Sequence, residues 1–306
     1  MTVPFVDADE LSRRLSMAGA IDALESAFRN GEPSATPPRS QVTTPSGTLL
    51  LMPATGDPGV GVKLVTLTEA NPARGLPLIH AVYVLFDAET QVPRLLVDGS
   101  ALTALRTAAV SGLATRWLAR QDSRTLVVFG AGVQARAHLE AMAAVRPLVE
   151  MTVVSRTQER AAELVGAAEA MGISASVGEA EAVAETDIIC TCTTASEPLF
   201  DGAILRAGMH LNAVGAFQPD TRELDTETIR RARVVVETRG SAWEEAGDLV
   251  IPLREGAITR EHVVADLQEL VRGKAVRRGP DDVTVFKSVG LAFEDLAVTG
   301  ALAATL

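Results

Sequence analysis

The sequence is poor in aromatic residues and in positive charge. Phe, Trp and Tyr make up only 4% of its 306 residues, so a core has to be built mainly from Ala, Val and Leu. Lys and Arg number 28 against 39 Asp and Glu, which gives a formal net charge of −11. A surface of this sign repels nucleic-acid backbones and anionic lipid, so we expect no nucleic-acid partner and no membrane partner. A small anionic substrate is compatible, because a few clustered cations can set the sign inside one cleft.

Cysteine, histidine and long apolar runs are scarce as well. Two cysteines cannot form a disulfide framework, and Cys190 and Cys192 are predicted as a buried pair on one face of a strand. The four histidines lack the spacing of metal ligands, so no metal site is expected. The sequence has no run of ~18 apolar residues and no basic segment before an apolar one at its start, which predicts a cytoplasmic protein without a membrane span.

The remaining composition, 47% hydrophobic and 22% charged, is typical of a folded protein, and the apolar positions follow two rhythms that predict two domains. Residues 7–30 suit one or two amphipathic helices that end at Asn30-Gly31. Short segments rich in Val, Leu and Thr follow without a helix between them, which is typical of a mostly antiparallel sheet. They lie near residues 38–44, 47–52, 60–68, 78–86 and 92–97, and a long helix is expected at 101–120.

From residue 121 onward, strand-like and helix-like segments alternate, which predicts right-handed βαβ crossovers and a parallel sheet. The strands are expected at residues 125–129, 151–154, 173–176, 187–191, 208–214 and 234–237, and two helices at 132–145 and 158–171. Residues 291–306 suit an apolar helix with no strand after it, which we expect to pack on the first half. The predicted fold class is α/β, with one domain at 1–120 plus 291–306 and a second at 121–290.

A glycine-rich motif marks the first turn of the second domain. Gly130-x-Gly132-x-x-Ala135 directly follows the strand TLVVF and opens a helix. Gly130 permits the tight turn, Gly132 lets the backbone approach a pyrophosphate, and Ala135 allows the helix to pack close to the sheet. The phosphates would lie on the N–H groups at the positive end of that helix. The alternative is a glycine-rich turn in a domain that binds no dinucleotide.

The end of the next strand indicates which dinucleotide is bound. An NAD site usually has Asp or Glu there to bind the ribose 2′-hydroxyl, but this strand ends in VSRT (residues 154–157), with Arg160 one turn later. A guanidinium and two hydroxyls suit a 2′-phosphate, so NADP(H) is predicted in preference to NAD(H), which is also possible. In the alternative interpretation, Arg156 is a solvated loop residue.

Several blocks of the sequence are similar, in the same order, to one known family. The blocks are GVGVKLVT, DGSALTALRTAAVSGLATRWLA, VVFGAGVQARAHL, VVSRT and FKSVGLAFEDLA, with Pro38-Arg39, Asn71 and Gly75-Leu76-Pro77. They span about residues 36–299 and resemble the ornithine cyclodeaminase/mu-crystallin family. The resemblance implies a Rossmann-type dinucleotide-binding domain inserted in a smaller α+β domain for substrate binding and dimerisation, and hence a homodimer.

The resemblance assigns Arg39, Lys63 and Arg106 to the α-carboxylate of the substrate. The sequence itself supports this for Lys63, because a lysine within an apolar strand is costly to bury unless an anion meets it. Lys63 could also relay the proton of the substrate nitrogen. Two alternatives stay open: Lys63 protects an edge strand, or Arg106 pairs with a structural carboxylate. His80 matches a position that approaches the cofactor, although a lone histidine is more often a core residue.

The resemblance covers further positions at the cofactor. Besides Gly130 and Gly132 they are Ala131, Val133 and Gln134 at the pyrophosphate, Ser155, Arg156 and Thr157 at the adenosine ribose, Thr193 after the fourth strand, and Val214 and Ser288 near the nicotinamide. The carboxyl ends of parallel strands are where such folds bind ligands. An ordinary Ser/Thr-rich loop is the alternative for Thr193 and Thr194.

Departures from the family pattern indicate a branch. Ornithine cyclodeaminases have an acidic residue where this chain has Leu49 to Leu51, and a catalytic aspartate where it has Phe217. Asp220 lies too far along to take that role. The resemblance to the reductase branch implies NAD(P)H-dependent reduction of a cyclic imino acid, such as Δ1-pyrroline-2-carboxylate or Δ1-piperideine-2-carboxylate. The alternatives are an ornithine cyclodeaminase, an alanine or N-alkyl-amino-acid dehydrogenase, and a non-catalytic mu-crystallin-like ligand-binding protein.

Overall fold

The computed structural model describes residues 2–306, which divide into two compact units. Unit 1 contains the residues up to Arg106 together with residues 290–306, and unit 2 contains residues 107–289. The chain enters unit 2 inside helix α3 (Gly99–Leu118), so this boundary precedes the predicted one at residue 120. The chain returns to unit 1 at Gly290, one residue before the predicted position.

Unit 1 is built on a six-stranded sheet in the order β1-β6-β5-β4-β3-β2. Neighbouring strands run antiparallel from β2 to β6, as predicted, whereas β1, a strand that the sequence pattern does not predict, pairs parallel with β6. The strands are β1 (Phe5–Val6), β2 (Ser40–Thr44), β3 (Gly47–Gly56), β4 (Gly59–Leu67), β5 (Ile79–Phe86) and β6 (Pro93–Asp98).

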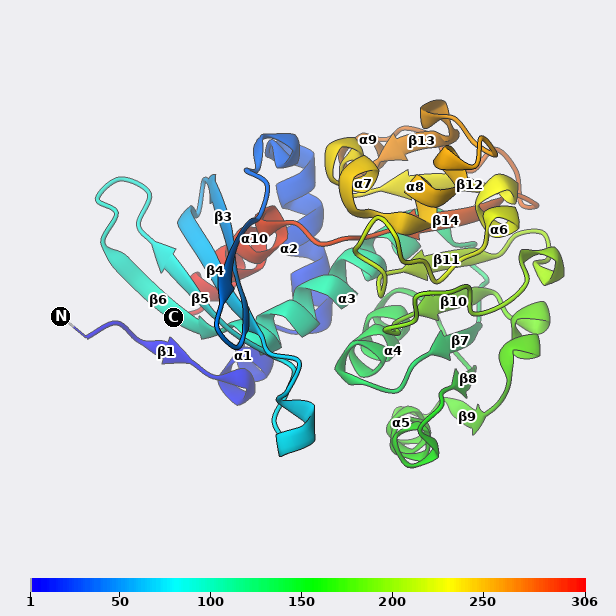
Figure 1. The fold of residues 1–306 in the computed structure, drawn as a ribbon, viewed down its shortest axis with the longest axis horizontal. Helices are drawn as coiled ribbons and strands as arrows, with labels where there is room; N and C mark the ends of the chain where they lie inside the picture. Colours follow the sequence, from blue (N-terminus) through cyan, green and yellow to red (C-terminus); the bar gives the residue numbers. More distant parts are fainter. Residues whose placement is uncertain (1) are drawn as a thin grey trace. The chain divides into compact units, whose positions relative to one another are not determined.

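Helix α10 (Ala292–Ala303) covers part of one face of this sheet. Two other helices, α1 (Ala8–Arg14) and α2 (Met17–Asn30), lie between β1 and β2 in the sequence. α2 begins after Ser16, whose hydroxyl accepts a hydrogen bond from the Gly19 N–H, and it ends before Gly31 as predicted. α10 packs against α2, β3 and β4, which confirms that the C-terminal segment belongs to the first half (Figure 1). Every second residue of β4 from Gly59 to Val65 is buried, as expected for a sheet covered on one side.

Unit 2 is built on a parallel sheet of eight strands in the order β13-β12-β14-β11-β10-β7-β8-β9, which confirms the α/β class. β13 and β14 lie in segments for which the sequence pattern predicts no strand. The strands are β7 (Thr125–Phe129), β8 (Glu150–Val154), β9 (Ser174–Val177), β10 (Ile188–Thr191), β11 (His210–Ala213), β12 (Ala232–Val236), β13 (Val263–Asp266) and β14 (Val283–Lys287). The helices that begin in this unit are α4 (Val133–Val145), α5 (Gln158–Ala170), α6 (Thr226–Arg231), α7 (Arg239–Glu245), α8 (Gly247–Arg254) and α9 (Leu267–Val271).

The strand order reverses next to β7. The chain passes from β7 to β8 and β9 on one side, then returns to place β10 and β11 on the other side (Figure 1). α4 packs on β7 and β10, and α5 packs on β8 and β9. Doubly wound sheets bind their ligands at such a reversal, outside the carboxyl ends of the strands.

The two cysteines carry free thiols, and Cys190 is buried in β10. Cys192 directly follows that strand and is only partly buried, so the prediction of a buried pair is wrong for Cys192. Within residues 2–306, no helix is long and apolar enough to cross a bilayer. The same part of the chain holds no group of three His, Cys, Asp or Glu side chains arranged for a metal ion.

Candidate functional site

The turn between β7 and α4 requires a glycine at Gly130. Its φ of +102° lies in the left-handed region, and its N–H donates to the Val154 carbonyl at 2.8 Å. A Cβ at this position would lie 2.6 Å from the Cys192 carbonyl oxygen. A larger residue would therefore force apart the segments that follow β7 and β10.

Gly132 faces open space instead. It is the N-cap residue of α4 and offers no side-chain acceptor, and a Cβ placed on it would meet no atom within 4 Å. No side chain at position 132 therefore accepts a hydrogen bond from the first N–H groups of α4. The positive end of the helix dipole lies at the same N-terminus. Ala135 is fully buried, which lets the helix lie close to the sheet. This turn fits a pyrophosphate.

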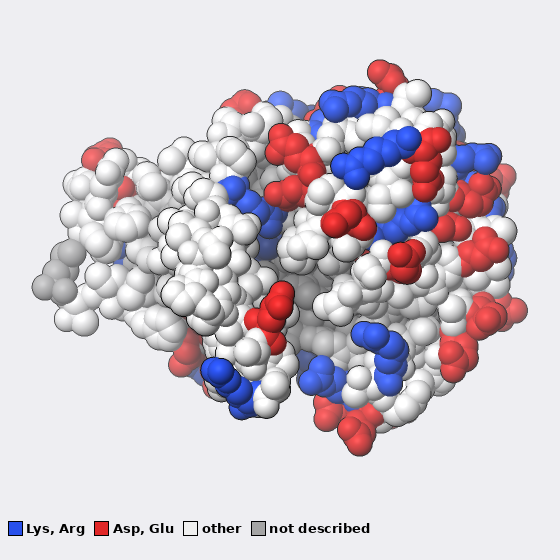
Figure 2. Space-filling view, viewed as in Figure 1, with Lys and Arg blue, Asp and Glu red and all other residues white. Residues whose placement is uncertain are grey.

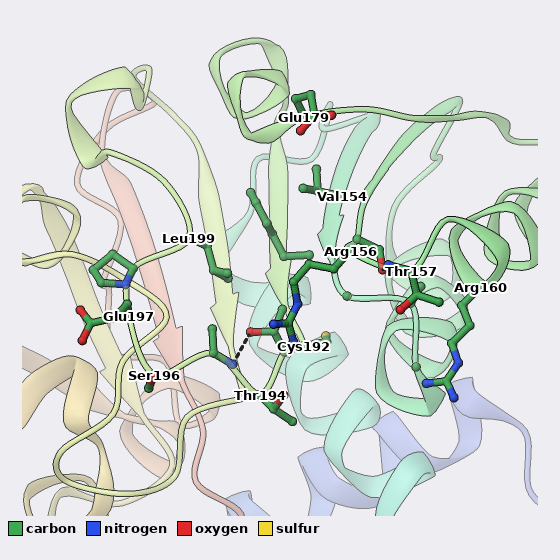
Figure 3. Close-up of a pocket in the computed structure, with 18 of the residues that line it drawn as sticks. Val154, Arg156, Thr157, Arg160, Glu179, Cys192, Thr194, Ser196, Glu197 and Leu199 are labelled. Atoms are coloured by element: carbon green, nitrogen blue, oxygen red, sulfur yellow. Dashed lines mark hydrogen bonds between the residues drawn. The ribbon is translucent and has the colours of Figure 1, made fainter. Parts of the chain in front are cut away.

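A pocket of about 760 Å³ lies at the carboxyl ends of β7, β8, β9 and β10 (Figure 3). Seven predicted cofactor residues line it: Gly130, Ala131, Gly132, Ser155, Arg156, Thr157 and Thr193. The other predicted residues of unit 2 do not belong to this lining: Val133, Gln134, Val214 and Ser288. His80 lies exposed on β5 of unit 1, so it is not a core residue.

The segment after β8 supplies cations to the pocket. Figure 3 shows the Arg156 side chain extending into the pocket, while Arg160 lies beyond Thr157 in this view. The strand ends without a carboxylate, as the sequence predicts, and Arg156 is exposed to solvent. Glu179, after β9, is an acidic residue of the lining. The position that follows β8 therefore has a cation where an NAD site usually has an acid.

One buried carboxylate ties together the segments that follow β10 and β11. Glu223 Oε1 accepts hydrogen bonds from the Thr193 N–H at 2.8 Å and from the Thr193 hydroxyl at 2.7 Å. Its Oε2 accepts from the Gly215 N–H at 2.7 Å and from the Thr191 hydroxyl at 2.8 Å. Burial raises the pKa of Glu223, and the charge of Lys287 and the threonine hydrogen bonds oppose that rise. Glu223 is a site residue that the sequence analysis misses.

A second buried network lies at the carboxyl end of β14. Lys287, the last residue of this strand, forms an ion pair with Asp248 at 2.7 Å. Asp248 also accepts the Glu223 N–H at 2.8 Å. The next residue, Ser288, donates its hydroxyl to Glu237 at 2.6 Å. Buried charges therefore hold the segments at this edge of the sheet in place.

The predicted carboxylate-binding cations lie in unit 1. Lys63 is on β4, which has β3 and β5 on either side, so the alternative that it protects an edge strand is wrong. Its side chain is buried, and its Nζ lies 2.9 Å from both carboxylate oxygens of Asp295 on α10. Burial and the charge of Arg106 lower the pKa of Lys63 to about 8, while Asp295 and Glu294 act in the opposite direction.

Arg106 pairs with Asp295 and also with Glu294. Its Nη1 lies 2.9 Å from Glu294 Oε2, and its Nε lies 3.3 Å from Asp295 Oδ1. Arg39 Nη2 donates to the Gly290 carbonyl at 2.9 Å. Gly290 has a φ of +83°, and a Cβ on it would lie 2.6 Å from Arg106 Nη1. Glycine at this position therefore leaves room for the Arg106 guanidinium beside the segment that leads into α10.

Three cations and two carboxylates thus meet at the start of α10: Arg39, Lys63, Arg106, Glu294 and Asp295. The alternative that Arg106 pairs with carboxylates of the protein is correct. We call these five residues the cation cluster. Guanidinium and ammonium groups gathered at one place suit a carboxylate ligand.

Glu294 and Asp295 are the other site residues that the sequence analysis misses. Both are fully buried on α10, in the apolar segment AFEDLAVTGALA. Charged residues are almost never fully buried unless they are paired. Two adjacent acids in an apolar helix are therefore a signal that cations from another part of the chain pack against it.

Comparison with known proteins identifies the family. The sequence profile of the ornithine cyclodeaminase/mu-crystallin family matches residues 4–303. The chain belongs to this family. A family relative, a Δ1-pyrroline-2-carboxylate reductase of Bacillus cereus, is 38% identical over 304 residues, which cover 96% of this chain and 93% of that protein.

Two solved structures share the fold of this family member. Δ1-pyrroline-2-carboxylate reductase of Thermococcus litoralis, in complex with NADH and L-proline, is 35% identical with a TM-score of 0.92, covering 98% of this chain and 96% of that one. An archaeal alanine dehydrogenase dimer with bound NAD is 32% identical with a TM-score of 0.92, covering 100% of this chain and 96% of that one. The fold class and the family expected from the sequence are thus confirmed.

Proposed function

We propose that this protein uses NAD(P)H to reduce a cyclic imino acid, with Δ1-pyrroline-2-carboxylate as the first candidate, to the cyclic amino acid. The observation that carries the proposal is the cation cluster, in which three cations of unit 1, Arg39, Lys63 and Arg106, gather at the start of α10. The pocket of unit 2 supports the dinucleotide part of the proposal. The Bacillus cereus reductase and the Thermococcus litoralis complex with NADH and L-proline support the substrate class.

In this mechanism the side chains of the protein bind and orient the substrate, while the dinucleotide, when bound, supplies a hydride. Arg39, Lys63 and Arg106 hold the substrate carboxylate, which fixes the neighbouring C2 carbon in position. The C=N bond gains a hydride at C2 and one proton at nitrogen, so the product is the saturated ring amine. A protonated imine is already electrophilic, so the protein needs no strong general base.

The test is a spectrophotometric screen of the purified protein with NADH and with NADPH. We expect oxidation of the reduced cofactor with five- or six-membered cyclic imino acids. Faster oxidation with pyruvate plus ammonia or methylamine would contradict the proposal in favour of an alanine or N-alkyl-amino-acid dehydrogenase. If neither kind of substrate causes oxidation of NADH or NADPH, the proposal is contradicted in favour of a ligand-binding role.

An ornithine cyclodeaminase is the less favoured function. Leu49, Leu50 and Leu51 on β3 provide no acid for a distal amine, and Phe217 stands where the family resemblance places a catalytic aspartate. Asp220 is exposed. Ammonia release from ornithine in the presence of NAD⁺ would show that other residues replace these two carboxylates.

We also propose that NADP(H) is preferred to NAD(H), because Arg156 extends into the pocket where an NAD site has an acid. Arg156→Asp removes a phosphate partner and adds an acceptor for a ribose hydroxyl. One charge-assisted contact corresponds to about 1.5–3 kcal/mol, so the ratio of kcat/KM for NADPH to that for NADH should fall by about 10- to 150-fold. The matched variant is Arg160→Asp: a shift with Arg160→Asp alone would assign the 2′ position to Arg160 instead.

A homodimer paired through unit 1 completes the proposal. One face of the sheet carries half-buried apolar residues that α10 does not cover: Leu49, Leu51, Val62, Leu64, Val82, Val84 and Leu96. Figure 2 shows few charged side chains over β3–β6, in contrast to the many over unit 2. β2 is an exposed edge strand, and a second copy would cover such an edge. We expect light scattering to give twice the chain mass at micromolar concentration, and a monomer mass would contradict this.

A further inference from the structure

Asp295 lies where two cations of the cluster, Lys63 and Arg106, meet. Its carboxylate oxygens are both 2.9 Å from Lys63 Nζ, and Oδ1 is also 3.3 Å from Arg106 Nε. Asp295 and Lys63 are buried, and Arg106 is nearly so. Glu294 is bonded differently, since its Oε2 is taken by Arg106 Nη1 and by the Leu291 N–H at 3.4 Å. Asp295 is thus the acid that contacts Lys63.

The surroundings of Lys63 contain few charged or titratable groups. On the two neighbouring strands, the residues directly opposite Lys63 are Met52 on β3 and Tyr83 on β5. α10 contributes Asp295 and Glu294, and α3 contributes Arg106. Burial, with the charge of Asp295 nearby, raises the pKa of Tyr83, so this phenol stays neutral. The charge of Lys63 therefore depends on one contacting acid, one more distant acid and one opposing cation.

We propose that Asp295 is a positioning residue for imine reduction, which keeps the Lys63 ammonium charged and directs it, together with Arg106, at the substrate carboxylate. The proposal rests on the proposed function for its catalytic readout. Asp295 does not itself bind substrate, because its oxygens face the two cations. It acts through Lys63: an ammonium in a buried, apolar sheet face loses its proton readily unless an anion lies beside it.

The direction of the effect follows from these charges. Burial and Arg106 favour the neutral amine, and Asp295 favours the ammonium, with a pKa near 8 as the outcome. Removing the charge of Asp295 leaves the two opposing effects in place, so the Lys63 pKa falls further. An opposite charge in contact typically shifts a pKa by about one to three units. A fall of about two units leaves roughly one tenth of Lys63 charged at pH 7.

The small number of lysines allows the shift in the Lys63 pKa to be measured directly by NMR. Lys63, Lys274 and Lys287 are its three lysines, so protein labelled with ¹³C and ¹⁵N at lysine gives three side-chain signals. Lys274→Arg removes the exposed one and assists assignment. We expect the Lys63 signal to titrate near pH 8 in the wild type and about one to three units lower in Asp295→Asn. An unchanged Lys63 titration would overturn the proposal, whether or not the protein reduces any imine.

Steady-state kinetics test whether the effect of Asp295 on Lys63 matters for imine reduction. Between about pH 5.5 and 9, the wild-type kcat/KM for the cyclic imine should decline as the pH rises through about 8. In Asp295→Asn this decline should move to lower pH. The variant should therefore be about 10-fold less active than the wild type at pH 7, and most of this difference should disappear near pH 5.5. The substrate titrates identically with both proteins, so the ratio of variant to wild type reports on the enzyme. L-Proline affinity, measured by calorimetry, should follow the same pH dependence. An equal loss at every pH would mean that Asp295 only supports the fold.

Two further variants keep the test decisive. Tyr83→Phe removes a buried hydroxyl that has no hydrogen-bond partner among the described residues, and it should leave the pH profile unchanged. If Asp295→Asn does not fold, as judged by circular dichroism, Lys63→Arg takes its place, because a guanidinium cannot lose its proton in this range. The decline near pH 8 should then disappear, and its persistence would overturn the proposal. A wild type that reduces no cyclic imine contradicts the proposed function and leaves the lysine titration as the test of Asp295.

Discussion

Arg106→Lys should lower kcat/KM for the cyclic imine by about 30- to 1000-fold, although the positive charge is retained. The guanidinium spreads its contacts over Glu294 and Asp295 through different nitrogens, which an ammonium cannot do with a single atom. Its carboxylate-binding geometry is lost for the same reason. Loss of one strong oriented contact at the reacting centre corresponds to roughly 2–4 kcal/mol.

The measurements for this variant are imine-reduction kinetics, dinucleotide affinity and the melting temperature. Dinucleotide affinity should change little, because residues of unit 2 alone line the pocket. Arg29→Lys is the matched control, since Arg29 forms an exposed ion pair with Glu25 and such pairs contribute about 0–1 kcal/mol. A variant that melts early but reduces the imine at the wild-type rate would remove Arg106 from the substrate-binding set and weaken the assignments of Arg39 and Lys63.

Glu223→Gln should weaken NADH binding by about 10- to 100-fold and lower the melting temperature. Each oxygen of Glu223 accepts a backbone N–H, one from Thr193 and one from Gly215. A glutamine has one oxygen and one NH₂ group, so either orientation places an NH₂ against a backbone N–H. A lost charge-assisted hydrogen bond in a buried site costs about 1.5–3 kcal/mol. The segment that begins at Thr193 lines the pocket, so its displacement reaches the cofactor.

Binding of NADH, followed by its fluorescence, checks this result. Asp220→Asn provides the control, because it removes an exposed acid from the same segment. Thr193→Val deletes one hydroxyl donor and leaves both N–H contacts in place, so its effect should be smaller than that of Glu223→Gln. NADH affinity and stability both equal to the wild type would show that the carboxylate charge is not needed at this position.

Local pattern was enough to predict the turn at Gly130 and the cation at Lys63. Gly130 needs a left-handed conformation set by its immediate neighbours, and Lys63 stands out as a charge inside an apolar strand. The partner of Lys63 could not be predicted in the same way, since Asp295 lies 232 residues further along the chain. Periodicity reports which face of an element is buried but not which other element covers it.

The strands near the end of unit 2 show the same limit. β14 is an inner strand of a parallel sheet, and all of its residues are buried on both faces, so it has no alternation of buried and exposed residues. It is inserted between strands that precede it in the sequence, and nothing in the local pattern specifies that order. The charge of Glu223 is hidden for a related reason, since its four donors come from other segments.

Unit 1 consists of two segments that are far apart in the sequence, and this affects how it folds while the chain is being synthesised. Lys63 and Arg106 leave the ribosome ahead of their acidic partners by 232 and 188 residues. At about 5–20 residues per second, the delay is on the order of 10–40 s. During that time Lys63 on β4 and Arg106 on α3 have no acid beside them, which opposes collapse of this part of unit 1. Unit 2, in contrast, is continuous in sequence. Release of α10 from the ribosome is therefore the event that lets unit 1 close, and a nascent chain stalled before residue 291 would present an open apolar sheet to chaperones and proteases.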